Sequence, residues 1–439
     1  MSDARHIPEK VIRIPAALPV DVGAYLPVID HPLFQKLRGR RQLGVNHLVF
    51  PGAVHTRFEH TIGVLGLTQR VCIIQRMSDR DTRDLSLFAL LHDIGHGPFS
   101  HQIEPVLGGS HHQRALHILD AMGESVESCG GDPAVLCRMF LGEDPRHAWV
   151  SGRNLGTDKL DYLQRDSLHI GFTGVPDIEQ ILLYMLMIDG TPAVEEKFIQ
   201  EVKRVQKFYS YLHQHGYLNK TALSVQRMFQ RAVEEELQHS ETPPEDLWAM
   251  TDDELMRWLS RGRSQLAAEL LARLESRRLH RTGIVIKPSG YAFVERTARK
   301  AVRVTEWSRA KLHAFCARMT NPRRLRELED RIARVAGLQP GEVLFAAMPY
   351  FDKLLPHDML IARRDGRHFQ LFEQDRHHYN SLLGDYLSTF AIRLIVVPDK
   401  RDAALRCAPS MMGLLEEVVA DWVRKSRGEV TPRAGELFE

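Results

Sequence analysis

Apolar residues recur at helical spacing through most of the first two thirds of this chain. In the segment DLSLFALLHDIGH (84–96), Leu87, Leu90 and Leu91 repeat at i, i+3 and i+4, and Asp84 in front of them is a candidate N-cap. The same periodicity appears over 59–76 and 157–169. Several apolar stripes of this kind are buried together only when helices pack against one another, so the sequence predicts a mainly α core.

The pattern changes after Arg281, where short β-branched or aromatic runs are bounded by Gly, Pro or Asp. The segment ARRDGRHFQ (362–370) contains the Asp-Gly pair typical of a hairpin turn. An amphipathic helix is predicted over 408–426. We therefore expect a helical domain over 1–281 and a smaller mixed α+β C-terminal region over 282–439, which could mediate assembly.

Composition sets outer limits on partners and compartment. The 58 Lys and Arg residues nearly balance the 56 Asp and Glu residues, so the net charge of +2 gives no global attraction to nucleic acid or anionic membranes. No secretory leader and no run of about 18 apolar residues is apparent. The five cysteines are scattered without CxxC spacing, which indicates free thiols. We expect a cytoplasmic protein with no membrane partner.

Histidines are concentrated between positions 55 and 117. Among them, His92 is followed directly by Asp93 at the end of an apolar helical segment, where both side chains can converge on one ion beyond the helix end. An imidazole and a carboxylate suit Mn, Fe, Zn or Ni without choosing among them. A His-Asp pair alone is weak evidence, and its specificity comes from the flanking segments.

Those segments are RFEH (57–60), HDIGHGPFSH (92–101) and TDKLDY (157–162). Together they resemble the HD-domain phosphohydrolases, in the branch that contains the deoxynucleoside triphosphate triphosphohydrolases, over about residues 28–225. The resemblance implies a helical HD-domain core and one divalent metal ion, which could be Mn, Mg, Fe, Zn or Ni. The implied metal ligands are His60, His92, Asp93 and Asp158.

Four protein ligands leave positions on a metal ion for water and a phosphate oxygen, and the ion makes the water far more acidic. The resemblance implies hydrolysis of a deoxynucleoside triphosphate to deoxynucleoside and inorganic triphosphate. Arg57, His101 and Lys159 flank the ligand segments and are expected to face phosphates. The resemblance also implies that a catalytic trio protonates the leaving group, and its members are His96, Glu104 and His111.

The helix predicted over 157–169 places Asp158, Tyr162 and Asp166 on one face, at i, i+4 and i+8. By resemblance, Tyr162 and Asp166 would contact the nucleotide sugar. Gln42 and Leu43 match residues that pack around the sugar. The resemblance further assigns nucleotide contacts or pocket closure to His213, Tyr217 and Lys220.

In regulated relatives an activating nucleotide binds at a subunit interface, and Asp30, Gln35 and Arg38 match part of that site. This implies a homo-oligomer, either a dimer or a tetramer. The same three residues could instead form a helix N-cap with surface polar side chains.

Two other functions stay open at this point. One is an HD phosphohydrolase or phosphodiesterase that acts on another nucleotide or on single-stranded nucleic acid. The other is a catalytically weak nucleotide sensor or nucleic-acid-binding module. The second is motivated by His112, which stands where relatives carry an acid, and by the basic runs at 275–281 and 321–327.

Overall fold

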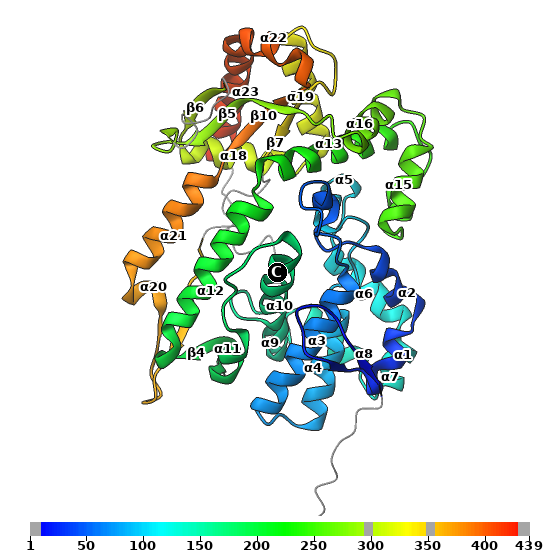
Figure 1. The fold of residues 1–439 in the computed structure, drawn as a ribbon, viewed down its shortest axis with the longest axis vertical. Coiled ribbons are helices and arrows are strands. Elements are labelled where there is room, and N and C mark those ends of the chain that lie inside the picture. Colours follow the sequence, from blue (N-terminus) through cyan, green and yellow to red (C-terminus); the bar gives the residue numbers. More distant parts are fainter. Residues whose placement is uncertain (1–9, 294–301, 348–355, 429–439) are drawn as a thin grey trace, which may run out of the picture.

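The computed structural model describes residues 10–293, 302–347 and 356–428. Its helical part occupies one end of an elongated molecule, and a mixed sheet with its covering helices occupies the other (Figure 1). The prediction of a mainly α fold with a smaller α+β C-terminal region is confirmed. No helix among the described residues is both long and apolar enough to cross a membrane.

Three helices position the site: α3 (Arg57–Ile74), α4 (Asp79–Leu91) and α10 (Thr157–Ile170). Helix α3 packs against both α4 and α10. The Thr56 side chain caps α3 by accepting a hydrogen bond from the Glu59 amide. Ser78 caps α4 in the same way. The predicted N-cap role of Asp84 is therefore wrong. Asp84 is buried inside α4, where it accepts a hydrogen bond from Arg146 at 3.0 Å.

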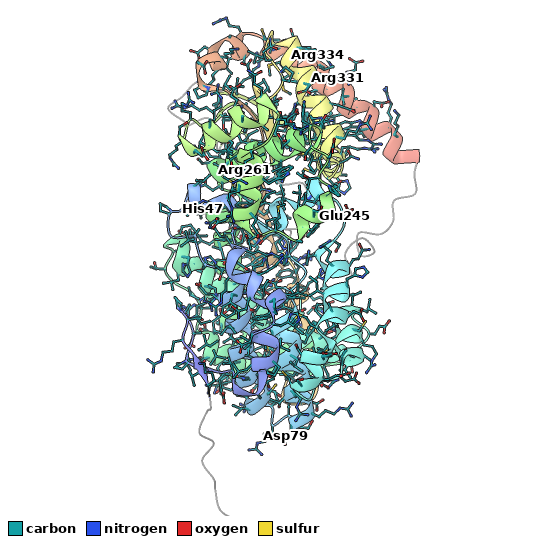
Figure 2. The ribbon with its side chains drawn as sticks, turned by 90° about the vertical axis from the view of Figure 1, so that its right-hand side faces the viewer. His47, Asp79, Glu245, Arg261, Arg331 and Arg334 are labelled. Carbon is teal, nitrogen blue, oxygen red and sulfur yellow. The ribbon has the colours of Figure 1, made fainter. Side chains whose placement is uncertain are left out.

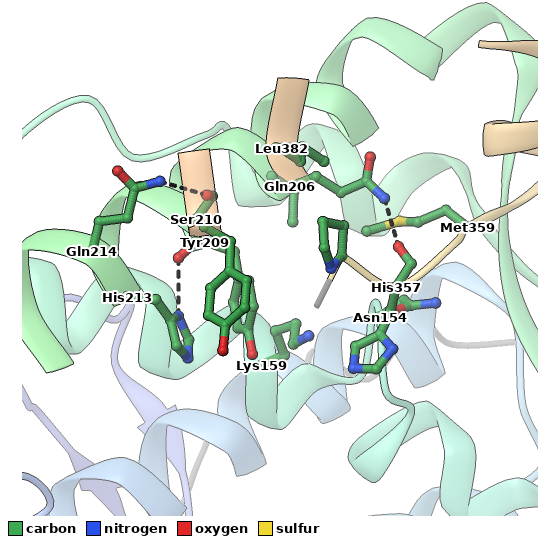
Figure 3. A pocket seen from close by; sticks show the side chains of 13 residues that line it. Asn154, Lys159, Gln206, Tyr209, Ser210, His213, Gln214, His357, Met359 and Leu382 are labelled. Atoms are coloured by element: carbon green, nitrogen blue, oxygen red, sulfur yellow. Dashed lines mark hydrogen bonds between the residues drawn. The ribbon is translucent and has the colours of Figure 1, made fainter. Parts of the chain in front are cut away.

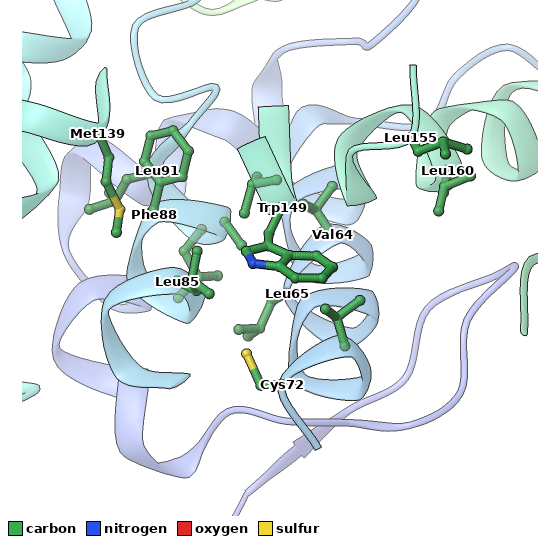
Figure 4. Packing of buried hydrophobic residues seen from close by; sticks show 14 of the residues in the cluster. Val64, Leu65, Cys72, Leu85, Phe88, Leu91, Met139, Trp149, Leu155 and Leu160 are labelled. Carbon is green, nitrogen blue, oxygen red and sulfur yellow. The ribbon is translucent and has the colours of Figure 1, made fainter. Parts of the chain in front are cut away.

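Trp149 fills the space between these helices (Figure 4). Its short helix α9 (Ala148–Ser151) packs against both α3 and α4. Val64 and Leu65 of α3 and Phe88 of α4 belong to the same buried cluster. Burying each such side chain contributes about 1.5–3 kcal/mol, so this packing fixes where the helix ends lie.

The other helices of the part before residue 281 are α1 (Leu26–Ile29), α2 (Pro32–Gln35), α5 (Glu104–Leu107), α6 (His111–Ala121), α7 (Gly123–Ser128), α8 (Pro133–Phe140), α11 (Ile178–Tyr184), α12 (Ile199–Leu212), α13 (Lys220–Leu237), α14 (Pro244–Trp248), α15 (Asp252–Ser260) and α16 (Gln265–Glu275). Those of the C-terminal part are α18 (Arg309–Met319), α19 (Pro322–Val335), α20 (Leu371–Gln374), α21 (Arg376–Thr389), α22 (Arg401–Arg406) and α23 (Ala408–Gly428). The exposed Arg331 and Arg334 of α19 lie at the outer end of the molecule (Figure 2).

The larger C-terminal sheet has the strand order β6-β5-β10-β7. Strand β10 is antiparallel to both β5 and β7, whereas β5 and β6 are parallel. Helices α18, α19 and α23 pack together with this sheet in one hydrophobic cluster. The strands are β5 (Arg281–Pro288), β6 (Arg303–Trp307), β7 (Val343–Ala346) and β10 (Ile392–Val396).

A second sheet has the order β3-β4-β8-β9 and joins segments from before and after residue 281. The predicted Asp-Gly hairpin is confirmed as β8 (Leu360–Ala362) and β9 (His368–Gln370). The other hairpin, β3 (Met185–Ile188) and β4 (Thr191–Glu195), was not predicted. Asp189 and Gly190 form its turn with positive φ angles of 47° and 74°, so its Asp-Gly pair was a usable signal.

Helix α13 joins the helical part to the C-terminal sheet, because it follows α12 after the turn at His213–Tyr217 and packs against β7 (Figure 1). Buried ion pairs hold the C-terminal half of α13 in place. Arg227 contacts both Glu234 and Glu329, while Arg231 contacts Glu329 and Asp330. Removing one partner of such a buried set would leave an unpaired charge, so the network ties α13 firmly to α19.

Candidate metal centre

Side chains from three helices meet at one point. His60 lies in α3, His92 is the C-cap of α4 with Asp93 next to it, and Asp158 lies in the first turn of α10. His60 Nε2 is 3.1 Å from Asp158 Oδ1 and 3.5 Å from Asp93 Oδ2. His92 Nε2 is 3.7 Å from Asp158 Oδ1 and 3.6 Å from Asp93 Oδ1. The structure thus brings together all four predicted ligands.

The hydrogen bonds of the two histidines test whether a metal ion fits here. His60 Nδ1 is bonded to Asp161 Oδ2 at 2.8 Å, and His92 Nδ1 is bonded to the Ala89 carbonyl at 2.7 Å. Both Nε2 atoms are buried and have no hydrogen-bond partner. With the proton on Nδ1, each Nε2 directs a lone pair at the shared point, which is the arrangement of metal-bound histidines. The residues therefore fit a divalent cation of the Mn, Fe, Zn or Ni type.

Asp161 supports this centre, although the sequence analysis did not select it. Its carboxylate accepts hydrogen bonds from His60 and, at 2.8 Å each, from Nε and Nη2 of Arg165. The ion pair of Asp161 and Arg165 requires a glycine at position 63, because a Cβ there would lie 2.0 Å from Asp161 Oδ1. Burial opposes a charge on His60, but the nearby carboxylates of Asp158 and Asp161 raise its pKa to about 10. The carboxylates thus make this point favourable for positive charge.

Arg57 faces a ligand carboxylate. Its Nη1 donates to Asp93 Oδ2, and its Nε donates to Ser100 Oγ at 2.7 Å. Burial alone would raise the pKa of Asp93, but the charge of Arg57 holds that pKa well below its usual range. Arg57 therefore keeps Asp93 ionised, and the phosphate contact expected for Arg57 stays a prediction.

The predicted catalytic trio surrounds the Glu104 carboxylate. Glu104 Oε1 is 3.1 Å from His96 Nδ1 and 2.8 Å from His111 Nδ1, while Oε2 is 3.3 Å from His101 Nδ1. On its other side, His96 Nε2 is 3.3 Å from Asp93 Oδ1. Burial would raise the pKa of Glu104, but the close ring nitrogens of His101, His111 and His96 hold that pKa well below its usual range.

His112 does not take the place of a carboxylate. Its ring centre lies 4.0 Å from that of His111, and burial, with a further contribution from His111, lowers the pKa of His112 to about 4. Glu104 supplies the negative charge beside His111.

Asp166 accepts hydrogen bonds from two directions. His55 Nε2 lies 2.8 Å from its Oδ1, and the Tyr217 hydroxyl donates to its Oδ2. Tyr217 closes a π-helical turn, His213–Tyr217, between α12 and α13. The backbone amide of Gln42 donates to the His55 carbonyl at 3.0 Å, and the buried Gln42 Oε1 has no hydrogen-bond partner. His55 was missed because nothing in its local sequence indicates contact with a residue 111 positions away.

A small pocket, with a cavity volume of about 40 Å³, lies beside α10 and α12 (Figure 3). Lys159 lines it with its Nζ 4.2 Å from the centre of the Tyr209 ring, and the Nζ donates to the Arg153 carbonyl at 2.5 Å. Burial lowers the pKa of Lys159 to about 8. His213 also lines the pocket. The polar lining residues that the sequence analysis did not select are Asn154, Gln206, Tyr209, Ser210, Gln214 and His357.

The remaining predicted residues differ in exposure. Leu43 is buried, Tyr162 is half-buried, and Lys220 is exposed at the start of α13. At the surface, Gln35 Nε2 donates to the Ile29 carbonyl and Arg38 Nε donates to Gln35 Oε1, each at 2.7 Å. Asp30 is exposed and does not cap α2, because the His31 side chain does so. The N-cap interpretation of Asp30 is therefore wrong, and the activator site stays a prediction.

Two family models match parts of this chain. Residues 57–130 match the model of the HD domain, and residues 210–309 match that of the HD associated region. This chain contains an HD domain. The family resemblance predicted from the RFEH, HDIGHGPFSH and TDKLDY segments is confirmed at this level.

Individual relatives of this HD-domain protein cover only part of it. It is 32% identical over 233 residues to a Dictyostelium discoideum protein named deoxynucleoside triphosphate triphosphohydrolase SAMHD1 homolog, with 47% of this chain and 45% of the relative covered. It is 29% identical over 266 residues to an uncharacterized protein of Methanocaldococcus jannaschii, with 58% and 55% covered. The chain thus spans about half the length of these curated relatives.

The fold recurs in a crystal structure of a phosphohydrolase from Bacteroides thetaiotaomicron VPI-5482. The TM-score is 0.66 with 23% identity, and the match covers 89% of this chain and all of the other (100%). This likeness shows a shared fold.

Proposed function

We propose that this HD-domain protein is a metal-dependent phosphohydrolase that converts a deoxynucleoside triphosphate to a deoxynucleoside and inorganic triphosphate. The observation that carries the proposal is the meeting of His60, His92, Asp93 and Asp158, with two buried Nε2 atoms left without hydrogen bonds. The HD-domain match and the name of the Dictyostelium relative support it.

A divalent cation held by these four side chains would act as a Lewis acid and lower the pKa of a coordinated water to about 7. The chain's own residues prepare this centre. Asp161 and the Ala89 carbonyl fix the orientation of the two imidazoles. Arg57 keeps Asp93 ionised. Holding the donors in place before the ion arrives reduces the reorganisation that binding requires.

Lys159 is the proposed phosphate contact on the pocket side, because its ammonium group is a compact charge next to the ligand Asp158. His101 is the second proposed phosphate contact, and 58% of its side chain is exposed. His111 is the proposed proton donor for the leaving oxygen. Its Nδ1 faces Glu104, whose negative charge stabilises an imidazolium.

Asp166 is the proposed acceptor for a sugar hydroxyl. An ionised carboxylate offers about four lone-pair positions, and His55 and Tyr217 occupy two of them. The remaining positions are available to the sugar. Because both partners hold the carboxylate in place, a 3′-hydroxyl would meet an acceptor of fixed orientation.

One observation favours a second candidate, a nucleotide with a shorter phosphate chain. A triphosphate carries more negative charge than one ammonium group can balance, and Arg57 is already engaged with Asp93. Among the predicted phosphate contacts, this leaves Lys159 and His101. A nucleoside monophosphate would need fewer cations from the protein.

The test is a hydrolysis panel run with metal-stripped protein that has been reloaded with Mn²⁺. The panel contains deoxynucleoside triphosphates, nucleoside monophosphates and single-stranded oligonucleotides, and mass spectrometry resolves the products. We expect inorganic triphosphate, its loss in Asp158→Asn, and normal release in Asp402→Asn, whose side chain is 86% exposed. Release of only monophosphate or pyrophosphate would contradict the triphosphohydrolase. Absence of turnover with every metal and substrate would contradict an enzyme and favour a nucleotide sensor.

A further inference from the structure

A second group of potential metal ligands lies next to the first. His96, His101 and His111 each direct Nδ1 toward the Glu104 carboxylate, at 2.8 to 3.3 Å. All four ligand atoms lie within 4.8 Å of one another. This cluster contains three nitrogens and one oxygen, and it shares no residue with the four-ligand centre at His60.

One hydrogen bond is formed inside this cluster, between His101 Nδ1 and Glu104 Oε2 at 3.3 Å. His96 Nδ1, His111 Nδ1 and Glu104 Oε1 are buried and have no hydrogen-bond partner, even though they are close. The rings of His96 and His111 are stacked with centres 3.9 Å apart at 16°, so both nitrogens approach the same oxygen side by side. A buried polar atom without a partner destabilises the folded protein. An ion bound among them would satisfy all three.

We propose that His96, His101, Glu104 and His111 form a second metal site, selective for a transition-metal ion such as Zn²⁺. Three imidazoles and one carboxylate suit zinc, whereas Mg²⁺ and Ca²⁺ prefer oxygen ligands. A tetrahedral ion with bonds of about 2.1 Å needs donor atoms about 3.4 Å apart. The observed separations from Glu104 are near that value, so small side-chain rotations complete the site.

Neighbouring residues orient one ligand of this cluster, and another ligand is open to solvent. His96 is 1% exposed at its side chain and contacts Asp93 through Nε2 at 3.3 Å, so its ring orientation is fixed on both sides. His101 is largely exposed, which gives an ion a path from solvent. One imidazole thus touches both metal sites, and the second site can load independently of the pocket at Lys159.

Occupancy of the second site would affect turnover, and this consequence rests on the proposed function. His111 and Glu104 are the groups proposed to protonate the leaving oxygen, so a metal ion bound to them displaces the proton. Zn²⁺ is therefore expected to inhibit activity supported by Mn²⁺. Metal binding itself does not depend on the nature of the substrate.

The experiment measures binding of Zn²⁺ to the full-length, metal-stripped chain by elemental analysis after gel filtration, with Co²⁺ absorption as a second signal. We expect two equivalents in the wild type and one in His101→Ala, a change at an exposed side chain. Glu104→Gln, which keeps the side-chain shape, should also bind one. His117→Ala, an exposed histidine of α6, is the control and should retain two.

A single equivalent in the wild type, or two equivalents in both His101→Ala and Glu104→Gln, would overturn the second site. Loss of one equivalent in His117→Ala would also overturn it, because it would indicate adventitious surface binding. Failure of the nucleotide panel would affect only the proposed function, since stoichiometry is measured without substrate. The two proposals can therefore fail separately.

Discussion

Replacement of Asp161 by Asn tests whether the buried carboxylate behind His60 determines metal affinity. In the native protein, Asp161 accepts one hydrogen bond from His60 and two from Arg165, all at 2.8 Å. His60 Nδ1 and Arg165 Nε share Asp161 Oδ2, while Arg165 Nη2 uses Oδ1. An asparagine can place its oxygen at the Oδ2 position, but its NH₂ group then faces the Nη2 donor, and the negative charge is lost. His60 Nδ1 is then left with a neutral acceptor, which is weaker than the carboxylate.

The expected loss of metal affinity is about 10- to 100-fold, the usual effect of removing a partner behind a ligating histidine. A separate stability cost arises because Arg165 is fully buried at 0% exposure, and an unpaired buried charge costs up to about 3–5 kcal/mol. Chelator-competed Mn²⁺ titration measures the first effect, and urea unfolding of the metal-free protein measures the second.

The double variant Asp161→Asn/Arg165→Met separates the two effects. It removes the unpaired charge, so it should recover stability without recovering metal affinity. Wild-type affinity in a folded Asp161→Asn protein would refute the reasoning, because His60 would then be oriented without this carboxylate. Recovery of affinity in the double variant would show that Arg165, and not His60, transmitted the effect.

Three further predictions concern other parts of the molecule. Burial lowers the pKa of Lys159 to about 8, so the KM for substrate should rise above pH 8 as the ammonium group loses its proton. Lys159→Arg should remove this rise, and a wild-type KM that does not change with pH would contradict the phosphate contact. Burial lowers the pKa of His280 to about 4. Between pH 6.5 and pH 4 the unfolded chain therefore gains a proton that the folded chain does not, so the free energy of unfolding should fall by roughly 3 kcal/mol, at about 1.36 kcal/mol per pH unit. Urea unfolding of His280→Gln should show a smaller loss over the same pH range, and an identical loss would refute the role of His280. Tyr217→Phe removes a donor to Asp166 and should raise KM for deoxynucleotides roughly tenfold with unchanged metal content, whereas an unchanged KM would exclude Asp166 from sugar binding.

The helices could be predicted because their signals are local. Apolar residues repeat within a few positions, and the predicted segments correspond to α3, α4 and α10. The errors were also local in origin. The apolar run favours Asp84 as its N-cap, whereas the helix begins several residues earlier and is capped by Ser78. The β3-β4 hairpin was overlooked although its turn contains Asp-Gly. The division at residue 281 stays a prediction.

The sequence by itself determined which residues could be metal ligands, because a few residue types and short motifs define that chemistry. Only the tertiary structure decided what those ligands contact. Asp161 reaches His60 across 101 positions, and His55 reaches Asp166 across 111, because α10 packs against α3 and its preceding loop. The same packing turns Arg57 toward Asp93 and gathers three imidazoles around Glu104. Such contacts depend on how whole helices are placed, which no short segment of sequence specifies.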